Sequence, residues 1–116
     1  MNAKRRTVEE GFAAIVDALG HRPGVTAPDT TRGSVRKFGS SALRVRGRIF
    51  AMVSRGRLVL KLPADRVSAL IDSGDGETYD AGKGRPLKEW VSLAPGRQDK
   101  WLGLATEALK FVDSRR

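Results

Sequence analysis

Apolar residues recur at helical spacing in three stretches of the chain, which predicts three helices that each bury one face. The first helix is expected over residues 8 to 19, because Thr7 and Glu10 form a capping box at its start. The second is expected to begin at Pro63, and the third is a C-terminal helix that follows Pro95. The residues expected to be buried are Val8, Phe12, Ile15, Val16 and Leu19 in the first helix, Val67, Leu70 and Ile71 in the second, and Trp101, Leu104, Ala105, Ala108, Leu109 and Val112 in the third.

Between the first and second helices the spacing changes to the alternation of strands, which predicts a β-meander over residues 35 to 62. Turns are expected at Arg46-Gly47 and at Ser54-Arg55-Gly56. The expected strands are Leu43 to Val45, Ile49 to Val53, Leu58 to Leu62 and Glu89 to Leu93, with a short one around Val25. The order helix, three strands, helix, one or two strands, helix predicts an α+β fold, a two-layer sandwich of an antiparallel sheet with helices on one face.

The period of a strand assigns the residues of the second hairpin to two faces. If Arg55-Gly56 is a two-residue loop, Val53 pairs with Leu58 across the turn. The wholly apolar face is then Ile49, Ala51, Val53, Leu58, Leu60 and Leu62. The opposite face carries Phe50, Met52, Ser54, Arg57, Val59 and Lys61.

The register of the first hairpin stays open at this point. Leu43 and Val45 can join the apolar face only if the turn before Ile49 has an odd loop or a bulge. Such an irregularity is expected to leave Arg44 beside Phe50 on the opposite face.

The chain has 116 residues, which predicts a single domain over residues 1 to 116 with one hydrophobic core. It has no cysteine, so disulfides and thiolate chemistry are excluded, as suits a reducing cytosol. Neither a signal-peptide pattern nor a run of about 20 apolar residues occurs. We therefore expect a soluble cytoplasmic protein that does not enter a membrane.

Charge is distributed unevenly along the sequence. The formal net charge is +9, and no acidic residue lies between Asp29 and Asp65. The cations of this acid-free stretch are Arg32, Arg36, Lys37, Arg44, Arg46, Arg48, Arg55, Arg57 and Lys61. Cations that project from strands without neutralising carboxylates attract polyanions, which favours nucleic acid as a partner. The alternative is ordinary surface charge, which keeps sheets soluble and their edges apart.

Residues that could carry catalysis are scarce. His21 is the only histidine, and without a cysteine or second histidine we expect no enzymatic activity. The acidic segment 72 to 80 fails the ligand spacing of a calcium loop, so a solvated loop without a metal is expected there. The glycines of segment 76 to 84 fail the spacing of a phosphate loop, and no cofactor is expected. Trp90 and Trp101 each neighbour apolar residues and are expected to fill the core rather than stack on bases.

Three segments carry a resemblance to a known family: R-K-F-G-S-S-A-L-R-V-R-G-R-I-F-A-M at 36 to 52, G-R-L-V-L-K-L-P at 56 to 63 and G-R-P-L-K-E-W at 84 to 90. Over most of its length the chain resembles the TfoX/Sxy N-terminal-domain family, which is related to the YjbR/MmcQ group. The resemblance implies a compact α+β domain of the kind that begins competence regulators, and DNA binding through a double-wing-like sheet. It implies neither catalysis nor a cofactor. Because the sequence ends at Arg116, we expect it to correspond to the first domain of such regulators and not to their second.

These inferences combine into one functional hypothesis. We expect a non-enzymatic regulator of transcription or competence that binds DNA, or RNA, mainly through phosphates and with weak sequence preference. The principal contacts are expected at Arg44, Arg46, Arg48, Arg55, Arg57 and Lys61, and secondary contacts at Arg36, Lys37, Lys83, Arg85 and Lys88. The alternative is an interaction module, in which the face of Phe50, Met52 and Val59, or an exposed strand edge, docks an acidic protein or a second copy of the chain. A third class is an enzyme or small-ligand binder that uses the loop from Lys83 to Lys88.

Overall fold

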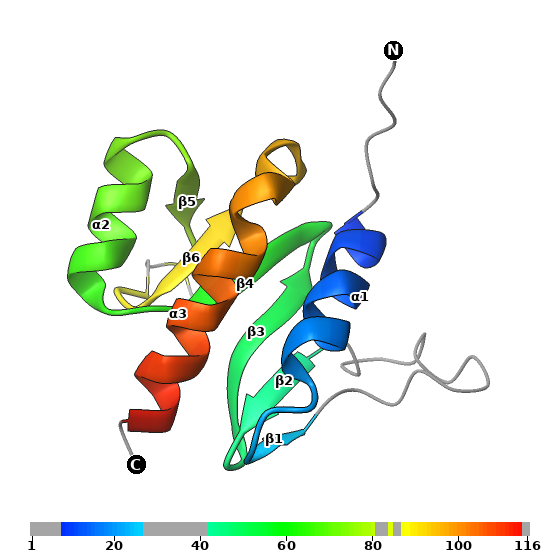
Figure 1. The fold of residues 1–116 in the computed structure, drawn as a ribbon. Coiled ribbons are helices and arrows are strands. Elements are labelled where there is room, and N and C mark those ends of the chain that lie inside the picture. The colour runs from blue at the N-terminus through cyan, green and yellow to red at the C-terminus, as the bar shows by residue number, and fades with distance from the viewer. Residues whose placement is uncertain (1–7, 27–41, 81–83, 85–86, 115–116) are drawn as a thin grey trace.

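The structure of the chain, a computed structural model, describes residues 8–26, 42–80, 84 and 87–114. It is an α+β fold in which a six-stranded antiparallel sheet packs against helices (Figure 1). The helices are α1 (Val8–Leu19), α2 (Ala64–Asp72) and α3 (Trp101–Ser114), and a 3-10 helix, η2 (Pro95–Lys100), leads into α3. The strands are β1 (Val25–Thr26), β2 (Ala42–Val45), β3 (Arg48–Ser54), β4 (Arg57–Lys61), β5 (Gly76–Thr78) and β6 (Trp90–Leu93). The predicted α+β fold is confirmed, but four strands and not three precede α2, because the short strand near Val25 is present as β1.

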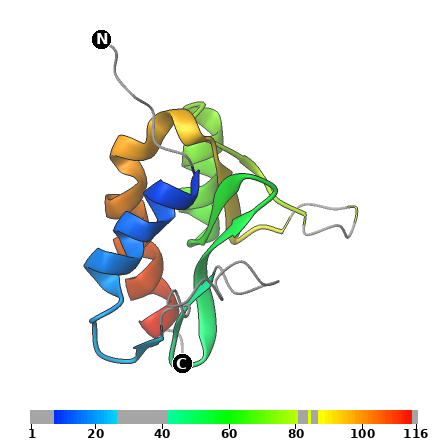
Figure 2. The same cartoon turned by 90° about the vertical axis from the view of Figure 1, so that its right-hand side faces the viewer.

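The helices of the described chain lie on one face of the sheet (Figure 2). α3 crosses β3 and β4, α1 packs beside α3, and α2 packs against β5 and β6. The predicted helical stripes are buried in one core, with only Val16 and Ile71 partly exposed. α1 comes close to the start of α3 because Gly11 lies there, where a Cβ atom would sit 2.7 Å from the Trp101 ring. Trp101 is therefore a core residue, as predicted.

The strand order across the sheet is β1-β2-β3-β4-β6-β5. β2, β3 and β4 form the predicted meander, and Val53 pairs with Leu58 as expected. The second hairpin turns through Arg55 and Gly56, whose φ angles are 55° and 74°. Two successive positive φ angles are the mark of a type I′ turn, the two-residue turn that suits the right-handed twist of a hairpin.

The first hairpin contains one of the irregularities that the sequence left open, but a different residue of β3 lies beside Arg44 than expected. Leu43 pairs with Ala51 and Arg44 pairs with Ile49, so Phe50 is an extra residue in β3, a β-bulge. The bulge turns Phe50 into the core, where it is fully buried, and leaves Ile49 on the face of Arg44. The prediction had these two residues on the opposite faces and was wrong, because the larger aromatic side chain gains more from burial.

The bulge also removes the expected docking surface. Phe50 and Val59 both have 0% of their surface exposed, and Met52 is partly buried. The prediction that these three residues form an exposed apolar face is therefore wrong.

The segment after α2 is the second correction, because the loop expected over residues 72 to 80 contains the strand β5. Gly76 pairs with Leu93 and faces the core, where an added Cβ atom would lie 2.5 Å from Cγ2 of Val91. Only glycine lets β5 approach β6 this closely without a shift. As the outer strand, β5 brings the acidic residue Glu77 beside Ser92.

Candidate nucleic-acid interface

The sheet face that the helices leave uncovered, here called the helix-free face, holds the candidate site (Figure 2). Strand alternation sends Leu43, Val45, Leu58 and Leu60 into the core, so their neighbours point the other way. The helix-free face consists of Arg44, Ile49, Met52, Ser54, Arg57, Val59, Lys61, Trp90 and Ser92. Three of the predicted principal contacts, Arg44, Arg57 and Lys61, thus share one face.

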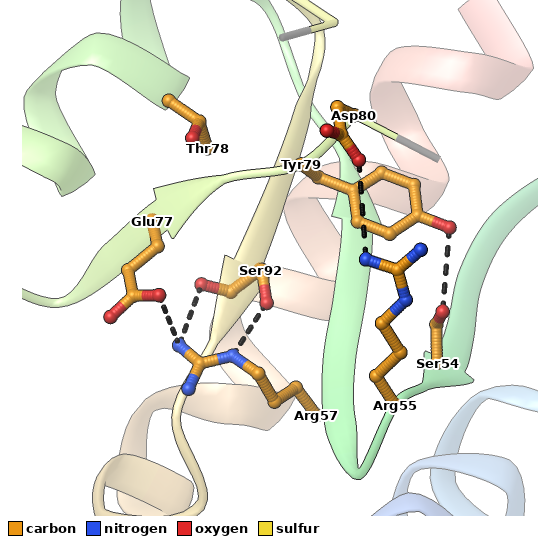
Figure 3. A pocket seen from close by; sticks show the side chains of 8 residues that line it. All are labelled: Ser54, Arg55, Arg57, Glu77, Thr78, Tyr79, Asp80 and Ser92. Carbon is orange, nitrogen blue, oxygen red and sulfur yellow. Dashed lines mark hydrogen bonds and ion pairs between the residues drawn. The ribbon is translucent and has the colours of Figure 1, made fainter. Parts of the chain in front are cut away.

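One end of this face, beside the turn between β3 and β4, is a polar pocket of about 260 Å³ (Figure 3). We call it the hairpin pocket, and its lining residues are Ser54, Arg55, Arg57, Glu77, Thr78, Tyr79, Asp80 and Ser92.

The two arginines of the hairpin pocket are held differently. Arg57 donates from Nε to the Ser92 hydroxyl at 2.6 Å and lies 3.5 Å from the Glu77 carboxylate. Arg55 reaches Asp80 only at 4.0 Å, and 68% of its side chain is exposed. Arg57 is therefore a fixed part of the sheet, whereas Arg55 points into solvent.

The other end of the face is a second cavity, of about 350 Å³, which we call the Trp90 cavity. Its lining residues are Arg44, Arg48, Ile49, Lys61, Trp90 and Val112. The lining thus combines three cations from β2, β3 and β4 with an aromatic ring and two aliphatic side chains, and it contains no acidic residue of the described chain. Arg44 and Arg48 are both exposed.

Trp90 contacts both a cation and a second aromatic ring. The Lys61 Nζ lies 5.4 Å from the centroid of the Trp90 ring, a cation–π contact. The Tyr79 ring also lies close, with its centroid 6.4 Å from that of Trp90 and the planes inclined at 51°. Trp90 is half-buried, and the expectation that it fills the core is wrong, because its place in β6 opposite Lys61 puts it on the helix-free face.

Carboxylates from distant parts of the chain neutralise several cations of the acid-free stretch. Arg46 donates to Asp113 of α3 at 2.6 Å, and Lys61 lies 4.0 Å from Glu89. With the Arg55 and Arg57 pairs, every one of these partners lies after Asp65, beyond the stretch itself. Exposed ion pairs of this kind contribute only about 0–1 kcal/mol, so a phosphate can replace the carboxylate.

The structure brings together part of the predicted contact set. Arg44, Arg48 and Lys61 meet at the Trp90 cavity, and Arg55 and Arg57 meet at the hairpin pocket. Arg46 lies apart from both cavities and pairs with α3, whereas Lys88 is exposed in the turn before β6. The secondary contacts Arg36, Lys37, Lys83 and Arg85 lie outside the described residues.

Sequence reasoning missed residues that complete the hairpin pocket. Glu77 and Tyr79 were assigned to a loop, and Ser92 was not considered. The alternation of Trp90 and Ser92 against Val91 and Leu93 within β6 was the available signal, because it separates two residues that carry a polar group from two wholly apolar ones.

No family model, curated protein or solved structure matches this chain. Within the described residues, no group of three or more His, Asp or Glu side chains could hold a metal ion. Nor does that part of the chain contain a helix that is long and apolar enough to cross a membrane. His21 is exposed after α1.

Proposed function

We propose that this chain is a non-enzymatic domain that binds nucleic acid, DNA or RNA, mainly through its phosphates. The observation that carries the proposal is the convergence of Arg44, Arg48 and Lys61 on the Trp90 cavity. Cations from three neighbouring strands that line a hollow with no acidic wall among the described residues concentrate a positive field. The net charge of +9 extends that attraction to a longer range.

The contacts of the described chain support a ranking of the candidate residues. Arg44, Arg48 and Lys61 come first because they share one cavity, and Arg55 and Lys88 follow because they are exposed. Arg46 and Arg57 rank lower as phosphate contacts, since each holds a short hydrogen bond to a side chain of the fold. In this proposal Arg57 fixes β4 to β6, and Arg46 fixes the turn after β2 to α3.

We also propose that the chain is a relative of the TfoX/Sxy N-terminal domains and the YjbR/MmcQ group, and acts as a regulator of transcription or competence. Support comes from the sequence resemblance at residues 42 to 52 and 56 to 63, which form β2, β3 and β4. An antiparallel sheet with helices on one face agrees with the α+β domain that the resemblance implies. The candidate contacts at the Trp90 cavity lie on these same three strands.

The test is a titration of labelled DNA at several salt concentrations with two charge-matched variants. For about five phosphate contacts on duplex DNA, the logarithm of the association constant should fall with log salt at a slope of about −4 to −5. Arg44→Ser should weaken binding and reduce the magnitude of this slope by about one. Arg46→Ser removes the same charge two positions away, but from a side chain already paired with Asp113, and should change the slope much less.

Two results would count against the proposal. Absence of binding at about 50 mM salt, where phosphate contacts are strong, would reject nucleic acid as the partner. Equal effects of Arg44→Ser and Arg46→Ser would mean that the general charge of the chain, and not the Trp90 cavity, attracts the ligand.

A further inference from the structure

We propose that the helix-free face takes single-stranded nucleic acid, with an unpaired base stacked on Trp90 and the adjoining phosphates held by Arg44 and Lys61. This inference rests on the proposed function, because it names which kind of nucleic acid fits the same site. It depends on the chemistry of the Trp90 cavity, which combines surfaces for a base and for a phosphate.

The two tryptophans of the chain have different environments. Trp101 is 2% exposed and lies within the core. Trp90 is half-buried on the helix-free face, where a tryptophan contributes little to the core. A large aromatic ring at an accessible, cation-rich surface is the feature that sequence-tolerant single-strand binders use for stacking.

The side chain of Lys61 lies over the ring of Trp90. Its ammonium group lies 5.4 Å from the ring centroid and 4.0 Å from the Glu89 carboxylate, and 32% of the Lys61 side chain is exposed. Both contacts are long, and a lysine head on a four-carbon stem can move at little cost. The ammonium can therefore shift from the indole to a phosphate when a base takes its place.

The cavity has the size and lining that a single nucleotide requires. Its volume of about 350 Å³ lies near the lower end of the range found for small-molecule sites, roughly 300–1,000 Å³. Ile49 supplies an apolar surface beside the Trp90 ring, Arg44 and Arg48 supply cations for phosphate, and the lining residue Val112 of α3 is 3% exposed.

Duplex nucleic acid fits this site poorly. A paired base is stacked inside its helix, and turning it out costs a few kcal/mol. Readers of the major groove usually insert a helix, but the described helices lie on the opposite face of the sheet (Figure 2). An unpaired strand offers its bases to Trp90 without that cost.

The experiment compares DNA and RNA strands of about 16 nucleotides with a duplex of the same length by fluorescence anisotropy. A Trp101→Phe variant serves in a parallel titration, because it leaves Trp90 as the only tryptophan and makes its emission a direct report of stacking. Single strands should bind at least about tenfold more tightly than duplex at equal salt and should quench Trp90, since stacking is available only to them.

Substitution of Trp90 tests the stacking itself. Trp90→Ala should weaken single-strand binding by about 5- to 150-fold, the range that one base–aromatic stack contributes. Trp90→Phe keeps an aromatic face and should lose less than about fivefold. A urea melt of both variants checks the fold, and Trp90→Phe carries the test if Trp90→Ala does not fold.

The outcomes separate this inference from the proposed function. Equal or tighter binding of duplex, with no change in Trp90→Ala, overturns the single-strand inference and leaves phosphate binding in place. Preference for single strands without quenching of Trp90 overturns the stacking position. No binding of strand or duplex at about 50 mM salt overturns the inference and the proposed function together.

Discussion

Replacement of Phe50 by alanine distinguishes the bulged register of the structure from the regular register that alternation alone favours. Phe50 has no exposed surface and belongs to the central core cluster. Truncation of a buried phenylalanine costs about 3–5 kcal/mol, which is a fifth or more of the roughly 5–15 kcal/mol that stabilises a typical domain. For a chain of 116 residues, a loss of this size lowers the melting temperature by roughly 10–20 °C.

The matched control is Met52→Ala, two positions along the same strand and on the helix-free face. Met52 is only partly buried, so its truncation should cost roughly 1–2 kcal/mol, below the range for a buried methionine. Urea unfolding followed by circular dichroism gives both values under one set of conditions. The reasoning fails if Phe50→Ala costs no more than Met52→Ala, because a regular β3 would place both side chains on the outer face and make the two costs similar.

Two further substitutions test contacts that the sequence did not predict. Gly76→Ala should cost about 1–3 kcal/mol in urea unfolding, because its Cβ would lie 2.5 Å from Val91 Cγ2. Combining it with Val91→Ala should recover part of that cost, and strict additivity would contradict the close contact. Arg57→Met should cost about 1–2 kcal/mol, since it leaves the Ser92 hydroxyl, in a residue 6% exposed, without its donor. Arg55→Met at an exposed site should stay within about 0.5 kcal/mol, and equal losses at the two arginines would be inconsistent with a structural role for Arg57.

Local patterns were sufficient for most of the fold. The helical stripes and the alternation of Leu58 to Leu62 depend on neighbours within one helix or strand, and those elements formed as predicted. The hairpin turn at Arg55-Gly56 also followed from its own residues, because the glycine readily takes the positive φ angle that the second position of a type I′ turn requires.

Features that depend on partners far along the chain could not be predicted in this way. β5 has only three residues and no alternation, and it is a strand because it pairs with β6. The β-bulge that turns Phe50 inward depends on packing in the core, since neither β2 nor β3 alone favours it.

The candidate site shows the same dependence on distant partners. The stretch between Asp29 and Asp65 lacks acidic residues in the sequence, yet Arg46 reaches Asp113, which is 67 positions away. Counting charges along the sequence therefore overestimated how many cations lack a carboxylate partner in the fold. It could not separate Arg44, which lines the Trp90 cavity, from Arg46, which fastens the end of β2 to α3.

The most direct test of the central claim is a nuclear magnetic resonance titration of the labelled protein with a short single-stranded oligonucleotide. Binding at the helix-free face predicts that the indole N–H signal of Trp90 and the backbone signals around Arg44 and Lys61 shift together. The indole signal of Trp101, which lies in the core, and those of α1 should stay in place. Shifts confined to the helices, or no shifts at all, would contradict the assignment of this face as the nucleic-acid interface.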